Sequence, residues 1–266
     1  MTRQFLLLLS LLALLITGPL YARSLDDIVS DGTIRIGVNP NFPPMSSFGM
    51  TNQLEGFDID VGRRIADAMG VDAEFVTTEA AQRVPFLVSG RIDIALGAMT
   101  RTPDRAKLIA FTVPLHSETM GVITTDKVDA NTWKDLDRED LTLVNMRGNL
   151  SVQLLKDKLP KPKVLLVDGN ADTIRAIAQG RADALVENVD FFLSFTKNFR
   201  AVKWRVLDDP IFVSYCGIGV GKAHKDLREF LNILLFDLHR NGDIDTLWQQ
   251  WYGAPMAAPV HTSPWF

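Results

Sequence analysis

Apolar positions along the chain follow two alternating periods. Short runs rich in Val, Ile and Leu predict strands at residues 33–38, 75–78, 92–99, 141–145, 164–167, 183–187 and 213–221. Between these runs, apolar residues recur every three or four positions, which predicts helices around 59–69, 84–87, 174–177, 227–238 and 247–251, and a further helix is predicted after Gly148. Strands and helices that alternate in this way are typical of α/β proteins with a largely parallel sheet.

The strand–helix plan occurs twice, once before and once after about residue 125. Two such cycles predict two α/β lobes with a cleft between them. Ligands of open α/β sheets bind beyond the carboxyl ends of the strands, and the boundary between two domains is a favoured place for a pocket. Residues that directly follow predicted strands are therefore the first candidates for a binding site.

The N-terminus has the pattern of a secretory signal peptide. Arg3 precedes an apolar run over residues 5–16, and a Gly-Pro pair and Ala22 follow it. Twelve helical residues rise only about 18 Å, which is too short for a hydrocarbon core of roughly 30 Å. We therefore predict cleavage after Ala22 and a periplasmic protein without residues 1–22.

Composition and charge narrow the class of protein. The 266 residues suit two lobes of ordinary size, and the hydrophobic fraction of 47% argues against disorder. The formal net charge of −4 and the absence of a long basic run argue against nucleic acid as a partner. Cys216 is the single cysteine, so no internal disulfide is possible, and the histidines lack zinc-site spacing. We expect neither a metal nor a cofactor.

Two other patterns give weaker signals. The glycines at 217–221 are followed by Lys222, as in phosphate-binding loops, but they alternate with apolar residues, so a strand is the better interpretation. No GxSxG motif occurs, and no histidine has a Ser or Cys partner in a recognisable motif. The sequence therefore contains no visible machinery for nucleophilic hydrolysis.

Several motifs occur in an informative order: FPP at 42–44, GFDIDV at 56–61, GAMTRTPDRA at 97–106, GRAD at 180–183 and TLWQQWYG at 246–253. Together they resemble the bacterial extracellular solute-binding proteins of family 3, the class that binds polar amino acids, over about residues 25–253. The acidic residues of GFDIDV also have a structural interpretation, because Asp58 and Asp60 suit the first turn of a helix.

The resemblance implies an α/β, two-lobed periplasmic-binding-protein fold of type II, with two crossover strands at about 119–124 and 212–219. Lobe one would comprise residues 23–120 and 217–266, and lobe two would comprise residues 121–216. A ligand held by both lobes would favour the closed state of the hinge.

The resemblance also implies a ligand site on lobe one. Arg105 matches the arginine that binds the ligand carboxylate through two hydrogen bonds, Thr100 would add a hydroxyl, and the carbonyl of Ala98 would accept from the ammonium group. Phe42 fits the aromatic wall, and Asn39 lies close to it after the first predicted strand. A surface arginine and a core phenylalanine are the simpler alternatives for Arg105 and Phe42.

Lobe two would supply residues from two places. Asn149 and Leu150 begin a predicted helix, where free N–H groups favour an anion, although a helix cap without ligand contact fits equally well. Asn188 aligns best with an Asp that commonly pairs with the ligand ammonium, with Glu187 and Asp190 beside it. An amide supplies no charge, so either a neighbour replaces the Asp or the ligand is not a simple α-amino acid.

Arg83 is the main candidate for specificity. It lies where relatives that bind glutamate or aspartate carry an arginine, so it would bind the side-chain carboxylate of the ligand. The alternative is that Arg83 faces solvent on a helix. Ala80 lies near a position that often holds a stacking aromatic residue in binders of basic amino acids. We therefore expect acidic amino acids or dicarboxylates to bind better than Lys or Arg.

These inferences predict a monomeric substrate-binding component of an ABC importer, with the membrane permease as its partner and no catalytic activity. One alternative is an enzyme similar to cyclohexadienyl dehydratase, which acts on prephenate or arogenate on the same fold, with Glu187 as general acid. Another is the sensor portion of a signalling protein. Fold resemblance alone does not decide between these functions.

Overall fold

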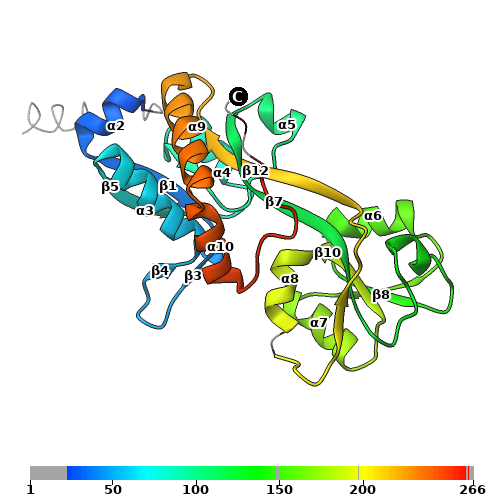
Figure 1. Ribbon diagram of the computed structural model, residues 1–266. Coiled ribbons are helices and arrows are strands. Elements are labelled where there is room, and N and C mark those ends of the chain that lie inside the picture. The colour runs from blue at the N-terminus through cyan, green and yellow to red at the C-terminus, as the bar shows by residue number, and fades with distance from the viewer. Residues whose placement is uncertain (1–22, 148–149, 197, 262, 264–266) are drawn as a thin grey trace, which may run out of the picture.

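The computed structural model describes residues 23–147, 150–196, 198–261 and 263 (Figure 1). The predicted signal peptide and Asn149 lie outside these residues. The helices are α2 (Leu25–Asp31), α3 (Phe57–Met69), α4 (Arg83–Val88), α5 (Pro103–Ala106), the 3-10 helix η2 (Trp133–Leu136), α6 (Leu150–Lys158), α7 (Asn170–Ala178), α8 (Val189–Thr196), α9 (Lys225–Arg240) and α10 (Asp243–Tyr252).

Nine of the strands form one large, curled sheet. They are β1 (Thr33–Val38), β5 (Asp72–Thr77), β6 (Ile94–Ala95), β7 (Ala110–Thr125), β8 (Thr142–Met146), β9 (Lys163–Val167), β10 (Ala184–Asn188), β11 (Trp204–Val206) and β12 (Phe212–Val220). The strand order is β5-β1-β6-β12-β7-β10-β8-β9, and β11 pairs with β7. Three short strands, β2 (Asn41–Phe42), β3 (Ser46–Phe48) and β4 (Leu54–Glu55), form a second sheet.

The chain has the two-lobed fold, and β7 and β12 run between the lobes (Figure 1). Strand β7 pairs with β12 from Ala110 to Met120 and with β10 from Met120 to Thr124. At Met120, therefore, the pairing of β7 changes from β12 in one half of the sheet to β10 in the other half. The parallel pairs β1–β5 and β8–β9 lie on opposite sides of this crossing, as the repeated plan predicts.

Separate hydrophobic clusters stabilise the two halves. The largest joins β1, α3, α9 and α10, and Phe57 and Trp248 are both fully buried in it. Trp248 packs edge-on against Phe57 at 5.4 Å and stacks on Tyr252 at 4.0 Å between ring centroids. Two further clusters lie around β7, β8 and β10. Each lobe thus has its own buried core, as an independent folding unit requires.

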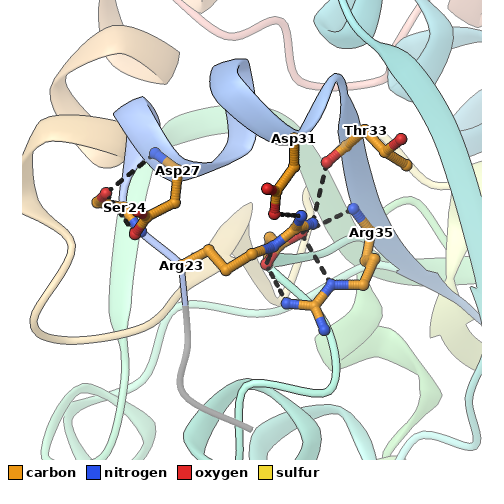
Figure 2. A network of polar contacts seen from close by, with 7 residues as sticks. Arg23, Ser24, Asp27, Asp31, Thr33 and Arg35 are labelled. Atoms are coloured by element: carbon orange, nitrogen blue, oxygen red, sulfur yellow. Dashed lines mark hydrogen bonds and ion pairs between the residues drawn. The ribbon is translucent and has the colours of Figure 1, made fainter.

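The start of the described chain is fixed by an ion-pair network (Figure 2). Asp93, whose side chain is fully buried, accepts hydrogen bonds from the guanidinium groups of Arg23 and Arg35 and from the Arg35 backbone N–H. Burial by itself raises the pKa of Asp93, but these bonds outweigh it and hold the pKa below its ordinary value. Ser24 caps α2 through a reciprocal bond with Asp27.

The structure confirms most predicted elements and corrects several. The predicted strand at 92–99 is a strand only at Ile94–Ala95, and a turn follows it. The crossover strand expected at 119–124 is part of the sixteen-residue strand β7. Helices α2 and α8 and the sheet β2–β4 were not predicted. The glycine run at 217–221 belongs to β12 except for its last residue, as the strand interpretation expects. The predicted lobe boundaries stay a prediction.

Candidate functional site

The turn after β6 brings three predicted site residues together. Gly97 and Ala98 both have positive φ, at 89° and 52°, which is a conformation that costs energy for a residue with a side chain such as Ala98. The backbone N–H of Thr100 donates to the Ala98 carbonyl at 2.9 Å, and the Arg105 Nη1 donates to the Thr100 carbonyl at 2.9 Å. Ala98, Thr100 and Arg105 therefore form one hydrogen-bonded unit.

A short helix positions Arg105 within this unit. Pro103 begins α5 and Thr102 caps it, because the Thr102 hydroxyl accepts from the Arg105 backbone N–H at 3.3 Å. Arg105 is half-buried, so part of its guanidinium group is available to a ligand. An arginine held in this way presents a planar pair of donors that matches a carboxylate.

Arg83 lies beneath the same turn and is 6% exposed. Its Nη1 donates to the carbonyl of Leu96 at 3.1 Å and to the carbonyl of Gly97. Burial and the nearby charge of Arg105 lower the pKa of Arg83. The alternative of a solvent-facing helix position is therefore wrong, because Arg83 is buried and bonds to backbone carbonyls. Its role in recognising a ligand side chain stays a prediction.

Asp58, the first acidic residue of GFDIDV, is fully buried near Arg83. Its carboxylate oxygens have no hydrogen bond of good geometry among the described residues, although the Gly97 N–H lies close enough to lower its pKa. Burial nevertheless dominates, and it raises the pKa of Asp58 to about 7 despite the charge of Arg83. Helix α3 has no side-chain cap, and Asp60 instead accepts from the Trp251 indole at 2.8 Å.

Glu118 is a residue of this region that the sequence analysis did not single out. It is half-buried on β7, and its carboxylate accepts from the Thr100 hydroxyl at 3.2 Å and from the Ser214 hydroxyl at 3.5 Å. Cys216 lies next to it, where burial and then the charge of Glu118 raise the pKa of the thiol. The available signal was a carboxylate among apolar residues just before a predicted crossover strand.

Lobe two carries its own carboxylates near this strand. Glu187 is 6% exposed, accepts from the Ser151 hydroxyl at 2.5 Å and accepts from the Asn188 N–H at 3.0 Å. Burial raises the pKa of Glu187, and the charge of Glu118 adds to the effect. Asn188 is half-buried at the end of β10, opposite Met120 of β7. The Leu150 side chain and Asn149 lie outside what the structure describes.

Asp190 is the second lobe-two carboxylate. It lies in the first turn of α8, and it accepts from the backbone N–H of Ala257 in the C-terminal segment at 2.9 Å. Burial raises the pKa of Asp190 to about 6, and the charge of Glu118 contributes. The Ser117 hydroxyl donates to the Ala258 carbonyl, so this segment also lies against β7, as its path in Figure 1 shows.

The remaining two predicted residues lie on the small sheet and just before it. Phe42 is half-buried and packs against the lobe-one cluster around α3 and against the lobe-two cluster around α8. It therefore touches both lobes, which fits a wall better than a core position in one lobe. Asn39 uses its side-chain oxygen in a local turn, where it accepts from the Asn41 N–H at 3.1 Å.

Comparison with known proteins identifies the family. The family model of the bacterial extracellular solute-binding proteins, family 3, matches residues 34–254. The chain belongs to this family. It is 26% identical over 222 residues to the ABC transporter arginine-binding protein 1 of Escherichia coli K12, an alignment that covers 82% of this chain and 90% of the relative.

Solved structures of family 3 proteins have the same fold. An ancestral cationic amino acid solute binding protein matches with a TM-score of 0.79 and 29% identity, over 86% of this chain and 99% of that one. A putative ABC transporter binding component from Wolinella succinogenes, complexed with lysine, matches with a TM-score of 0.72 and 25% identity, over 84% and 97% of the two chains. This family 3 protein is thus a solute-binding protein related to amino acid-binding components of ABC transporters, not an enzyme.

No group of three or more His, Cys, Asp or Glu side chains among the described residues is arranged to hold a metal ion. None of the helices in the described part of the chain is both long and apolar enough to cross a membrane.

Proposed function

We propose that this protein is the periplasmic substrate-binding component of an ABC importer and that it binds one α-amino acid where the lobes meet. The observation that carries the proposal is the hydrogen-bonded unit of Ala98, Thr100 and Arg105. It holds a guanidinium group at the end of a strand, where ligands of α/β folds bind. Arg105 would bind the ligand carboxylate, and Phe42 would pack against its aliphatic part.

The charged residues near the site favour a basic ligand side chain, whereas the sequence predicted an acidic one. The preference for acidic ligands depended on Arg83, which bonds to the carbonyls of Leu96 and Gly97. The carboxylate of Glu118 lies close enough to Glu187 and to Asp190 to raise the pKa of each. We therefore propose that Arg or Lys binds better than Glu or Asp, in keeping with the arginine-binding relative.

A thermal-shift panel of the standard amino acids tests this proposal. Binding to the native state alone raises the free energy of unfolding by RT ln(1 + [L]/Kd), so the ligands are ranked by the shift in Tm. We expect the largest shift with L-arginine or L-lysine, confirmed by calorimetry on the refolded, ligand-free protein. No shift with any amino acid would overturn the proposed function. A larger shift with L-glutamate would overturn only the proposed side-chain preference.

The dehydratase alternative needs a separate assay. Prephenate and arogenate are incubated with the protein, and the absorbance of the aromatic product is followed. Turnover that disappears in Glu187→Gln would favour the enzyme. We expect none, because the relatives are binding proteins and Glu187 already bonds to Ser151 and the Asn188 backbone. The predicted monomer is checked by analytical ultracentrifugation.

A further inference from the structure

An amino acid bound through Arg105 needs a negatively charged partner for its α-ammonium group. Asn188, at the position where an acidic residue was expected, has no charge. Its backbone lies in the β10–β7 ladder opposite Met120. A charged group must therefore come from another residue if an α-amino acid is the ligand, and Glu187 already bonds to the Ser151 hydroxyl and the Asn188 N–H.

We propose that Glu118 is a ligand-binding residue that pairs with the α-ammonium group of the bound amino acid. This inference rests on the proposed function. Glu118 lies on β7 two residues before Met120, the point at which β7 passes from β12 to β10. It is thus on the strand that both lobes share, and it is half-buried, so its charge acts at short range.

Thr100 is hydrogen-bonded to both Glu118 and Arg105, so these two charged residues lie on either side of it. The Thr100 carbonyl accepts from Arg105 at 2.9 Å, and the Thr100 hydroxyl donates to Glu118 at 3.2 Å. The carboxylate and ammonium groups of an α-amino acid are attached to one carbon atom. The residues that bind these two groups must therefore also lie close together, as Arg105 and Glu118 do on either side of Thr100.

The hydrogen bonds of Glu118 leave room for such a role. Its partners among the described residues are the hydroxyl groups of Thr100 and Ser214, at 3.2 and 3.5 Å, and the Cys216 thiol, and no ion pair to it occurs there. A carboxylate has about four acceptor sites, so these three uncharged donors do not exhaust it. The donors also fix the orientation of the carboxylate before the ligand arrives.

The electrostatics of lobe two agree with a cation beside Glu118. Burial and then the charge of Glu118 raise the pKa values of Glu187 and Asp190, so Glu118 repels each of these two carboxylates. An ammonium group beside Glu118 would reduce this repulsion. Closing lobe two on the ligand would then gain free energy that the empty site lacks.

The test compares two variants of the full mature chain. Glu118→Gln keeps the size of the side chain and an acceptor for the Thr100 and Ser214 hydroxyls but removes the charge. Glu229→Gln makes the same change at an exposed position on α9 and is the control. Calorimetry measures Kd for the tightest amino acid of the panel and for its analogue without the α-amino group, such as 5-guanidinopentanoate for arginine.

We expect Glu118→Gln to weaken binding of the amino acid about 30-fold or more, with an unchanged Tm in the absence of ligand. Binding of the analogue should change little, because it lacks the group that Glu118 holds, and Glu229→Gln should bind like the wild type. Equal losses for amino acid and analogue, or no loss, would overturn the role of Glu118. Wild-type protein that binds no amino acid would instead overturn the proposed function.

Discussion

The two lobes bring opposite charges to their junction, and they hold them differently. Lobe one presents Arg105, with Arg83 beneath it, and both guanidinium groups donate to backbone carbonyls of one turn. Lobe two presents Glu187 and Asp190, and burial raises the pKa of each. The lobe-one charges are thus fixed by the chain itself, whereas those of lobe two are costly to bury without a cation.

This difference suggests that the two lobes contribute to ligand binding in different ways. A preformed cationic turn can receive a carboxylate in the open state without reorganisation. The carboxylates of lobe two gain most when a ligand cation reaches them, which requires both lobes to face the same ligand. The energy of closure should therefore come mainly from lobe two, and the following substitutions test each side.

The largest effect is expected beneath the lobe-one turn. Arg83→Met leaves the Leu96 and Gly97 carbonyls without their donor and removes the cation near the buried Asp58. Leaving a buried acceptor without its donor costs about 1–3 kcal/mol for each of the two carbonyls, and the loss of the nearby cation adds to this. We expect a loss of this size in the free energy of unfolding, measured by urea denaturation.

A double-mutant cycle separates this charge effect from lost packing. In the Asp58→Asn background, Arg83→Met should cost clearly less, because no buried carboxylate is left without its cation. Additive losses in the two variants would show that Asp58 and Arg83 act independently.

Arg105 should matter for the ligand more than for the fold. Arg105→Lys keeps the charge but loses the paired donors, so calorimetry should show affinity for the amino acid reduced by about 2–5 kcal/mol, roughly 30-fold or more. The neighbouring exposed Arg101→Lys is the matched control. If Arg105→Ala bound the ligand with wild-type affinity, the carboxylate site would have to be sought elsewhere.

Phe42 should report on the contact between the lobes. Phe42→Ala removes a half-buried ring that packs on both hydrophobic clusters, and we expect about a tenfold loss of ligand affinity, or about 1.4 kcal/mol. Phe48→Ala, on the same small sheet but 51% exposed, should have little effect. Small-angle scattering should also show a smaller ligand-induced decrease in radius of gyration for Phe42→Ala than for Phe48→Ala.

The smallest expected effect is the pH dependence of lobe two. Asp190 has a pKa of about 6 in the folded protein, above its ordinary value of 3.8. The folded state therefore binds more protons between about pH 4 and 6, and the contribution of this group to stability falls as the pH rises through that range. Asp190→Asn should remove this part of the pH dependence of Tm, whereas Asp140→Asn at an exposed position should not.

The sequence predicted local features well. Thr100 and Arg105 belong to one short motif whose spacing determines a turn and a helix cap, so six residues suffice to place them. The strands β1, β9 and β10 and the helices α3 and α9 also follow from their own periodicity. Strand β7 was predicted only in part, because Pro114, His116 and Glu118 interrupt its alternation of apolar residues.

The unpredicted parts depend on contacts between distant segments. Arg83 occupies a helix position that looks exposed in the sequence, and only packing against residues 96–97 shows that it is buried. Glu118 and Thr100 are eighteen residues apart and meet because both are placed by β12: Thr100 forms a bridge with Cys216, and β7 runs antiparallel to β12. No local pattern contains this information.

The C-terminal segment has a mechanical consequence for the motion between the lobes. Two strands that cross side by side define a bending axis but resist twisting only weakly. Ala257 adds a third attachment away from that axis, because it follows α10 in lobe one and donates to Asp190 in lobe two. Motion of one lobe relative to the other must therefore either break this bond or carry the segment along, which makes the C-terminal segment a sensitive place for a spectroscopic probe.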